Sequence, residues 1–317
     1  MGLIDVPNYR SSHSNPTPRG GGLAITIAFL IFFSILAFIS DIDRSLYFGI
    51  ISTFALIALL GLLDDIYTLS KKVRIISWIG ITSISILCGM TIHQITLPII
   101  GTVQFGILSP VITFLWLIGV TNFFNFMDGI NGIAGFEALI VSGFLGWVSI
   151  LAGNELTLII SAVLFSSVIG FLPYNFPTAR IFLGDVGSNS LGFILGIAAI
   201  IGSQSTSDNI PFMVPVILMF MFLLDASSTL IIRIPKGKSW LEPHRDHTYQ
   251  RLIINGLSHV QVTLIYSLCS LLLGILGLLY FQGSQKQQIW ILILAILPFL
   301  LTYLFSLAVK KKRWNKR

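Results

Sequence analysis

Long apolar blocks separated by short polar stretches make up most of this chain. A helix needs about 20 mostly apolar residues to cross the core of a bilayer, so each block predicts a transmembrane helix. The pattern therefore predicts an all-α fold, a polytopic membrane helical bundle of about ten transmembrane helices. The predicted spans cover residues 23–40, 46–63, 75–90, 108–127, 133–152, 156–172, 188–201, 210–232, 260–280 and 288–309.

Residues 91–107 interrupt this pattern. The segment contains Thr-Leu-Pro and then the sequence TVQF with a glycine on either side. Short runs bounded by Gly and Pro are typical of strands and turns. We expect a small extracytoplasmic β-hairpin or a re-entrant segment here rather than a helix.

Composition narrows the class of protein. Of the 317 residues, 55% are hydrophobic and 10% are charged, whereas a soluble domain carries about 25% charged residues. These values exclude a soluble globular domain and a disordered chain. The two cysteines, Cys88 and Cys269, lie inside apolar blocks, so we expect neither a disulfide framework nor a zinc site.

The basic residues fall almost entirely on one side of the predicted membrane. When the connections alternate between two sides, all of the 19 Lys and Arg residues except Arg44 and Lys286 share the side that holds both termini. Short loops rich in Lys and Arg stay in the cytoplasm, so we assign this side to the cytoplasm. The net charge of +6 thus reports topology and contact with membrane lipid, and we expect no nucleic-acid partner.

The domain organisation follows from the same pattern. We expect a single integral membrane domain over residues 1–317. A cytoplasmic loop that contains histidines occupies residues 233–259, and a basic tail occupies residues 310–317.

Four polar clusters lie at the predicted cytoplasmic ends of the spans. The first is the pair Asp64 and Asp65, which directly follows the apolar run ALIALLGLL. Adjacent carboxylates at a helix end repel each other and are costly near lipid, so they favour a cation. The alternative is the solvated start of a loop that also carries Lys71, Lys72 and Arg74.

The second cluster lies in the segment TNFFNFMDGINGIAG. Asn122 and Asn125 share one helix face inside an apolar segment, and Asp128 ends that helix. The alternative is that the Asn side chains only bond neighbouring helices. The high polar density inside a membrane segment favours a binding site.

The third cluster lies in PYNFPTARIFLGDVGSNS. The sequence Gly-Asp-Val-Gly-Ser stands just before an apolar helix, so it presents a carboxylate together with free backbone N–H groups. This combination suits a metal-bound phosphate at a helix N-terminus. Asp185 or Ser188 could instead only cap the helix, a role that does not need the flanking glycines.

The fourth cluster is EPHRDHTYQRL in the His-containing loop. His244, Arg245 and His247 offer hydrogen-bond donors to a phosphate. The spacing of the two histidines is too weak to assert zinc, and a solvated loop is the alternative. Asp225 lies inside a span, and we interpret it as a structural hydrogen-bonding residue between helices rather than a catalytic one.

The ionisable residues of these clusters come from separate loops but share one predicted face. A transporter would place ionisable groups near the bilayer midplane in two related halves, and the sequence shows no inverted repeat. Carboxylates for a divalent cation, Asn and Gly for a nucleotide, and His and Arg for phosphate indicate phosphoryl-group chemistry at the membrane surface. The residues concerned are Asp64, Asp65, Asp128, Asp185, His244 and His247.

Five segments in this order resemble the polyprenyl-phosphate N-acetylhexosamine-1-phosphate transferase family, which is glycosyltransferase family 4 and includes phospho-N-acetylmuramoyl-pentapeptide transferase. They are PNYRSSHSNPTPRGGG, GLLDD, NFFNFMDGINGIAG, FLPYNFPTARIFLGDVGS and the His-containing loop. The resemblance implies transfer of an N-acetylated amino-sugar-1-phosphate from a UDP-sugar to undecaprenyl phosphate, with Mg²⁺ or alternatively Mn²⁺, and release of UMP. It also implies a multi-pass protein of the bacterial inner membrane with a cytoplasmic active site.

The resemblance assigns roles to the acidic residues. Asp185 would be a Mg²⁺ ligand. Asp64 and Asp65 would be the catalytic pair, either helping to hold the metal or deprotonating the lipid phosphate. Direct attack by the lipid phosphate on the sugar-linked phosphorus is favoured, and a covalent aspartyl-phosphate route stays open.

The resemblance also assigns residues to the substrates. The loop at residues 16–22 would border the same cleft. The nucleotide-binding residues would be Asn125, Asp128 and Phe182, and the residues that contact the diphosphate or the sugar would be His244, Arg245 and His247.

Two features depart from the pattern of the family. Its members usually have one more helix before the Pro-Asn-x-Arg segment, and we expect that helix to be missing here. The loop sequence HRDHTYQRL is similar to the branch that starts O-antigen and other surface glycans from UDP-activated 6-deoxy amino sugars, such as N-acetylfucosamine or N-acetylquinovosamine. We therefore favour a 6-deoxy sugar.

Three alternatives stay open at this point. The same reaction on UDP-N-acetylglucosamine is the nearest alternative. A multi-span lipid or anion transporter is the alternative from another class. A homodimer is compatible with the sequence.

Overall fold

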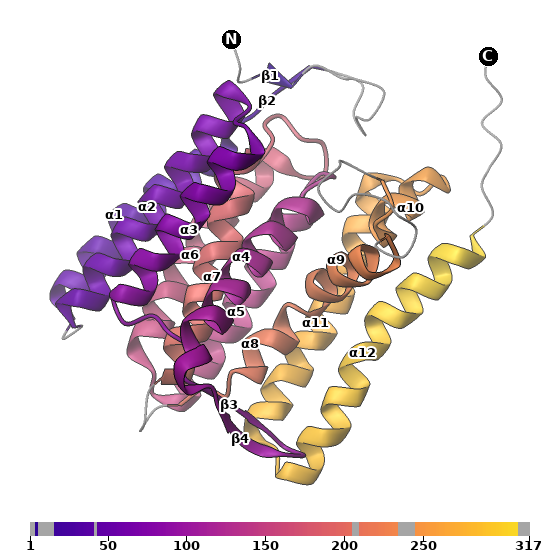
Figure 1. Ribbon diagram of the computed structural model, residues 1–317. Coiled ribbons are helices and arrows are strands. Elements are labelled where there is room, and N and C mark those ends of the chain that lie inside the picture. Colours follow the sequence, from indigo (N-terminus) through magenta and orange to yellow (C-terminus); the bar gives the residue numbers. More distant parts are fainter. Residues whose placement is uncertain (1–3, 6–15, 41–42, 205–208, 234–244, 310–317) are drawn as a thin grey trace, which may run out of the picture.

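The computed structural model describes residues 4–5, 16–40, 43–204, 209–233 and 245–309. Within these ranges the chain forms one bundle of long helices, and its strands pair in two small two-stranded sheets (Figure 1). The predicted all-α membrane bundle is confirmed. Helices that are long and apolar enough to cross a membrane are α1 (Gly21–Ile39), α2 (Arg44–Tyr67), α4 (Ser109–Met127), α5 (Ile133–Ala152), α6 (Glu155–Asn175), α7 (Gly184–Gln204), α11 (His259–Gln282) and α12 (Gln285–Ala308).

Two of the ten predicted spans take a different form. The helix α3 (Lys71–Leu87) is shorter than the other spans. The segment predicted at residues 210–232 is divided at Met219 into α8 (Met213–Leu218) and α9 (Phe220–Arg233). The amide of Met219 still donates to the carbonyl oxygen of Pro215, at 3.2 Å, so the chain continues across the break.

The helix α7 lies at the centre of the bundle and is almost wholly buried. It packs against α1, α2 and α4. Glycines allow this close approach: a Cβ atom on Gly22 of α1 would lie 2.1 Å from the Cα atom of Gly187, and one on Gly192 would lie 2.8 Å from the carbonyl oxygen of Val120. Small residues let membrane helices pack with their backbones in contact.

The two ends of the bundle carry different elements. The strands β3 (Gln94–Leu97) and β4 (Gly101–Gln104) form an antiparallel hairpin, which confirms the hairpin predicted within residues 91–107. At the opposite end lie β1 (Ile4–Asp5), β2 (Thr17–Pro18) and the short helix α10 (Thr248–Ile254) (Figure 1). We call this second end the predicted cytoplasmic end.

Two helix boundaries at the predicted cytoplasmic end differ from the expectation. The helix α2 continues to Tyr67, so Asp64 and Asp65 lie in its last turns rather than after it. The helix α7 begins at Gly184, one turn before the predicted start at Ser188. The start of α7 has a clear cause, because the carboxylate of Asp65 accepts hydrogen bonds from the amides of Asp185 and Val186 and joins the two helix ends.

The contact between α1 and α7 gives a stability test. The substitution Gly22→Ala should lower the unfolding free energy by about 1–3 kcal/mol, because the new Cβ would overlap the backbone of Gly187. Gly80→Ala in α3 is the matched control, since nothing lies within 4 Å of its added Cβ. Thermal unfolding in detergent measures both. Equal midpoints for the two variants would contradict this packing.

Candidate active site

The carboxylate of Asp65 holds the start of α7. Asp65 is buried near the end of α2. Its Oδ1 accepts from the backbone N–H of Asp185, and its Oδ2 accepts from that of Val186, both at 3.1 Å. The first amides of a helix have no partner within the helix, and a carboxylate there also interacts favourably with the helix dipole. Both oxygens of Asp65 are therefore engaged in positioning α7.

Glycines bring the two helix ends into contact. Gly184 has a φ of +75°, and a Cβ atom there would lie 2.6 Å from Asp65 Oδ2. A Cβ atom on Gly61 would lie 2.5 Å from the carbonyl oxygen of Asp185. Only glycine fits these two positions. The segments GLLDD and FLGDVGS, which are far apart in the sequence, thus interlock through their glycines.

The side chain of Asp185 meets residues from α4 and α2. Its Oδ1 accepts from Nδ2 of Asn125 at 2.9 Å, and the same amide nitrogen donates to Ser188 Oγ at 3.0 Å. The carboxyl group of Asp185 also lies close to those of Asp64 and Asp65, and their negative charges repel one another. A shared proton or a cation beside them would relieve such repulsion.

Asp64 has partners of its own on the loop that follows α2 and on α3. Its Oδ1 accepts from the backbone N–H of Leu69 at 2.7 Å, and its Oδ2 pairs with Arg74 Nη1 at 3.0 Å. These contacts and the one with Asp185 distinguish it from Asp65, whose oxygens both face backbone amides. The two adjacent aspartates thus have different surroundings.

Asp128 is the third acidic residue of the site. It caps the C-terminal end of α4 and lies outside the spans. Burial raises its pKa to about 8, and the nearby charges of Asp185 and Asp65 add to this effect, whereas Arg19 opposes it. The carboxylates of Asp65, Asp128 and Asp185 are thus close enough to repel one another.

The loop at residues 16–22 borders the acidic residues, as the resemblance implied. The backbone N–H of Phe182 donates to the carbonyl oxygen of Pro18 at 2.8 Å, and the N–H of Gly21 donates to the carbonyl oxygen of Phe182 at 2.9 Å. The guanidinium of Arg19 pairs with Asp5 at 2.9 Å and also interacts electrostatically with Asp65 and Asp185. Arg19 is therefore a basic residue of the site.

The oxygen donors of the site are of the kind that Mg²⁺ prefers. Within the part of the chain that the structure describes, no three His, Cys, Asp or Glu side chains form a ready-made metal site. Mg²⁺ usually takes only one or two carboxylates and completes its shell with water and substrate oxygens. Asp64 and Asp185 are two carboxylates of this kind at the start of α7. Asn189 Oδ1, one turn further along α7, is buried without a hydrogen-bond partner among the described residues and offers another oxygen.

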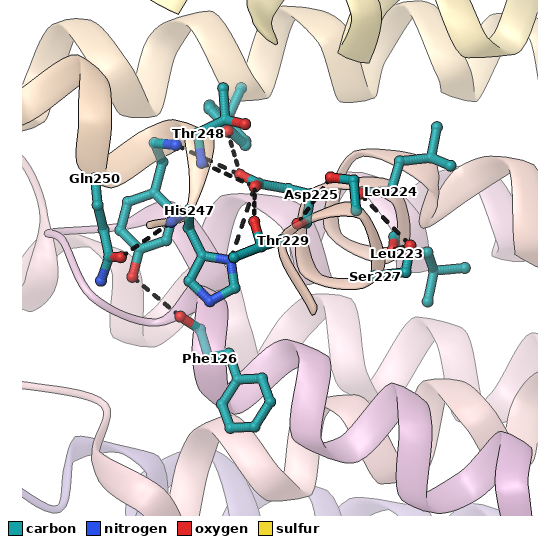
Figure 2. A network of polar contacts seen from close by, with 12 residues as sticks. Phe126, Leu223, Leu224, Asp225, Ser227, Thr229, His247, Thr248 and Gln250 are labelled. Carbon is teal, nitrogen blue, oxygen red and sulfur yellow. Dashed lines mark hydrogen bonds and ion pairs between the residues drawn. The ribbon is translucent and has the colours of Figure 1, made fainter. Parts of the chain in front are cut away.

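The helix α10 brings part of the His-containing loop to the end of α4. The hydroxyl of Tyr249 donates to the carbonyl oxygen of Phe126 at 3.0 Å, and a Cβ atom on Gly129 would lie 2.1 Å from that hydroxyl oxygen. The ring of His247 lies 6.3 Å from the ring of Phe126 (Figure 2). The Nη2 atom of Arg245 is buried without a hydrogen-bond partner among the described residues.

The structure brings most of the predicted site residues to one end of the bundle. Asp64, Asp65, Asp185 and Asn125 interact with one another, and Asp128 interacts with them through its charge. The residue His244, most of the loop that precedes it and the tail at residues 310–317 lie outside the described residues.

Three site features were not predicted from the sequence. Arg19 is one of the basic residues that indicate the cytoplasmic side, and only its place before three glycines in RGGG suggests a binding site. Asn189 stands between Ser188 and Ser190 near the start of α7, a buried membrane helix in which an amide is unusual. The partners of Asp225 include two backbone amides, which no residue type in the sequence indicates.

Fold and site together define a polytopic membrane protein with an acidic cluster at one end of its bundle. A model of glycosyl transferase family 4 matches residues 47–203. This chain belongs to that family. The match covers α2 to α7, and therefore all the acidic residues of the site.

The curated relatives share most of their length with this chain. A probable undecaprenyl-phosphate N-acetylglucosaminyl 1-phosphate transferase of Bacillus subtilis (strain 168) is 29% identical and aligns over 94% of this chain and 82% of its own length. A decaprenyl-phosphate N-acetylglucosaminephosphotransferase of Mycolicibacterium smegmatis is 29% identical and aligns over 91% of this chain and 78% of its own length. An undecaprenyl-phosphate alpha-N-acetylglucosaminyl 1-phosphate transferase of Escherichia coli (strain K12) is 25% identical over 100% and 87%.

The raised pKa of Asp128 predicts a pH effect on stability. The folded protein keeps a proton on Asp128 up to a pH of about 8, whereas the unfolded chain releases it near the ordinary value of 3.8. Folding stability therefore falls as the pH rises through this window. Asp128→Asn is neutral at every pH, so its midpoint should rise relative to the wild type from about pH 4 to about pH 8 and then level off. Thermal unfolding without divalent cations measures this, and a constant difference would contradict it.

Proposed function

We propose that this protein transfers an N-acetylated amino-sugar-1-phosphate from a UDP-sugar to undecaprenyl phosphate and releases UMP. The observation that carries the proposal is the contact between the carboxyl groups of Asp64 and Asp185 at the N-terminus of α7. Membership of glycosyl transferase family 4 and the names of the relatives support the same reaction.

The charges of the substrates explain why such a site is needed. A lipid phosphate must approach a sugar diphosphate, and both are anions. A bound Mg²⁺, or alternatively Mn²⁺, would offset their repulsion and stabilise the charge that develops during transfer. Asp185 and Asp64 would hold this ion, and Asn189 would supply a further oxygen. Arg19, Arg245 and His247 would offer positive charge or hydrogen-bond donors to the phosphates.

The two adjacent aspartates have different roles in this proposal. Asp65 is a positioning residue, because both of its oxygens accept from amides of α7. Asp64 faces Asp185 and is the residue placed to accept the proton of the lipid phosphate. Direct attack by the lipid phosphate is favoured over an aspartyl-phosphate route. Both oxygens of Asp65 accept from amides of α7, which argues against Asp65 as the nucleophile, and a route through Asp64 stays open.

The nucleotide would lie between the ends of α4 and α7. Asp128 stands at the end of α4, and Phe182 precedes α7 on a segment pinned by the loop at residues 16–22. Asn125 is engaged by Asp185 and Ser188. Its role in the nucleotide pocket would therefore include holding Asp185 in place.

The donor sugar has two candidates. The names of the relatives all specify N-acetylglucosamine, and we propose UDP-N-acetylglucosamine as the first. The loop HRDHTYQRL favours a 6-deoxy sugar such as N-acetylfucosamine or N-acetylquinovosamine, with a lipid-linked O-antigen or surface glycan as the product. The sidedness of the basic residues supports a cytoplasmic active site in a bacterial inner membrane.

The reaction and the sugar can be tested together. Purified protein with undecaprenyl phosphate and Mg²⁺ should release UMP from UDP-N-acetylglucosamine, as measured by chromatography of the nucleotide. Release from the UDP-6-deoxy sugars alone would replace the first candidate by the second. Folded protein that releases no UMP from any of these donors would contradict the transferase and favour the transporter.

The role of Asp185 has its own test. Asp185→Asn should lower UMP release by at least 100-fold, on the order expected for loss of a group that stabilises charge in the transition state. Asp43→Asn is the matched control, because Asp43 caps α2 at the opposite end of the bundle and Asn is an equally good cap. Near-normal release by a folded Asp185→Asn protein would refute the assignment.

A further inference from the structure

Arg19 lies at the edge of the acidic cluster and pairs with a carboxylate outside it. The acidic cluster comprises Asp64, Asp65, Asp128 and Asp185. The Nη2 atom of Arg19 lies 2.9 Å from Oδ2 of Asp5, in the strand β1. Arg74 differs, because it pairs with a member of the cluster, Asp64. Arg19 thus brings a positive charge to the cluster while its ion-pair partner stands on a separate element.

The backbone on both sides of Arg19 is fixed against the segment that precedes α7. The carbonyl oxygen of Pro18 accepts from the N–H of Phe182 at 2.8 Å, and the N–H of Gly21 donates to the carbonyl oxygen of Phe182 at 2.9 Å. These two bonds enclose Arg19 in the sequence. The position of its Cα atom relative to the start of α7 is therefore well defined.

The charge of Arg19 acts on the acidic cluster. A Cβ atom on Gly184 would lie 2.6 Å from Asp65 Oδ2 and 3.2 Å from the backbone nitrogen of Gly20, so the residue after Arg19 lies beside a carboxylate of the cluster. The guanidinium interacts electrostatically with Asp65, Asp128 and Asp185. These carboxylates repel an anionic substrate, and the positive charge of Arg19 reduces that repulsion.

Asp5 restricts the positions that this charge can take. The register of the small sheet places Asp5 opposite Thr17 of β2, and Arg19 directly follows β2. An arginine side chain has many rotamers, and a fixed carboxylate selects among them. The Arg19 side chain is still 40% exposed. A guanidinium has five N–H donors in one plane, so one edge can bind a carboxylate while another binds a phosphate.

We infer that Arg19 binds a substrate phosphate and that Asp5 is a positioning residue that acts through Arg19. The inference rests on the proposed function and deepens it, because it makes the strand β1 part of the substrate site. The phosphate belongs to the donor diphosphate or to the acceptor lipid. In both, a phosphate oxygen would accept from the guanidinium. The alternative is an ion pair that only joins β1 to the end of β2, and a partly exposed pair contributes little to stability.

Steady-state kinetics separate the two roles. Arg19→Gln should raise KM for UDP-N-acetylglucosamine or for undecaprenyl phosphate by about tenfold or more, because a charged hydrogen bond to the phosphate is lost. The substrate affected identifies the phosphate. Should Arg19→Gln fail to fold, Arg19→Lys, which keeps the charge but not the planar fork, should raise the same KM by a smaller factor.

The role of Asp5 is tested in the same assay. Asp5→Asn should raise the same KM by a smaller factor than Arg19→Gln does, and Asp5→Glu, which keeps the ion pair, should stay closer to the wild type. The double variant should lose little more than Arg19→Gln alone, because Asp5 acts only through Arg19. Arg44→Gln is the matched control for a lost positive charge, since Arg44 is exposed at the start of α2, at the opposite end of the bundle.

A second readout does not depend on turnover. Calorimetry with Mg²⁺ present measures the binding of inorganic pyrophosphate, a probe of the donor diphosphate, and of undecaprenyl phosphate in detergent micelles. Arg19→Gln should weaken the binding of one probe by about fivefold or more, whereas Arg44→Gln should weaken neither.

Two results would overturn the inference. One is unchanged KM values and unchanged binding in a folded Arg19→Gln protein, and the other is multiplicative losses in the double variant. Absence of UMP release by the wild type would overturn the proposed function instead, and the binding of the two probes would still decide the role of Arg19.

Discussion

The site depends on the two hydrogen bonds that the carboxylate of Asp65 accepts from backbone amides at the start of α7. The helix α7 is the most buried of the candidate spans, and its N-terminal amides need acceptors in a region that holds little water. The Asp65 carboxylate provides them from α2. Rotation or sliding of α7 would leave a buried charge and two amides unpaired, which is very costly. Asp185, Ser188 and Asn189 are therefore held in one orientation.

The acidic residues at this end differ in what remains for them to bind. Asp65 and Asp225 are saturated by backbone amides, so each joins two parts of the fold. Asp64 and Asp185 lie close to each other, and Asp128 lies near Asp185. Carboxylates of the first kind join parts of the bundle. Those of the second kind are crowded, although Asp64 already pairs with Arg74, and added positive charge would relieve the crowding.

The sequence predicts the spans and the hairpin because both follow from the hydropathy of local segments. Residues 133–152, for example, coincide with α5 at both ends. The sequence does not predict the start of α7, because that start is capped by Asp65 through a contact between residues 120 positions apart. The interpretation of Asp225 as a structural residue agrees with its hydrogen bonds, but the sequence does not identify its partners. Two of them are the backbone amides of Thr248 and Tyr249. Because every residue other than proline has such an amide, no residue type marks these partners in the sequence.

Asp225 anchors the start of α10 through backbone amides, so this anchor does not depend on which side chains stand in the segment before α10. The hydroxyl of Tyr249 on that helix in turn donates to the carbonyl oxygen of Phe126 at the end of α4. The acidic cluster lies within the match to the family model, whereas α10 lies beyond it. Separate carboxylates, Asp65 and Asp225, thus hold these two parts of the same end of the bundle.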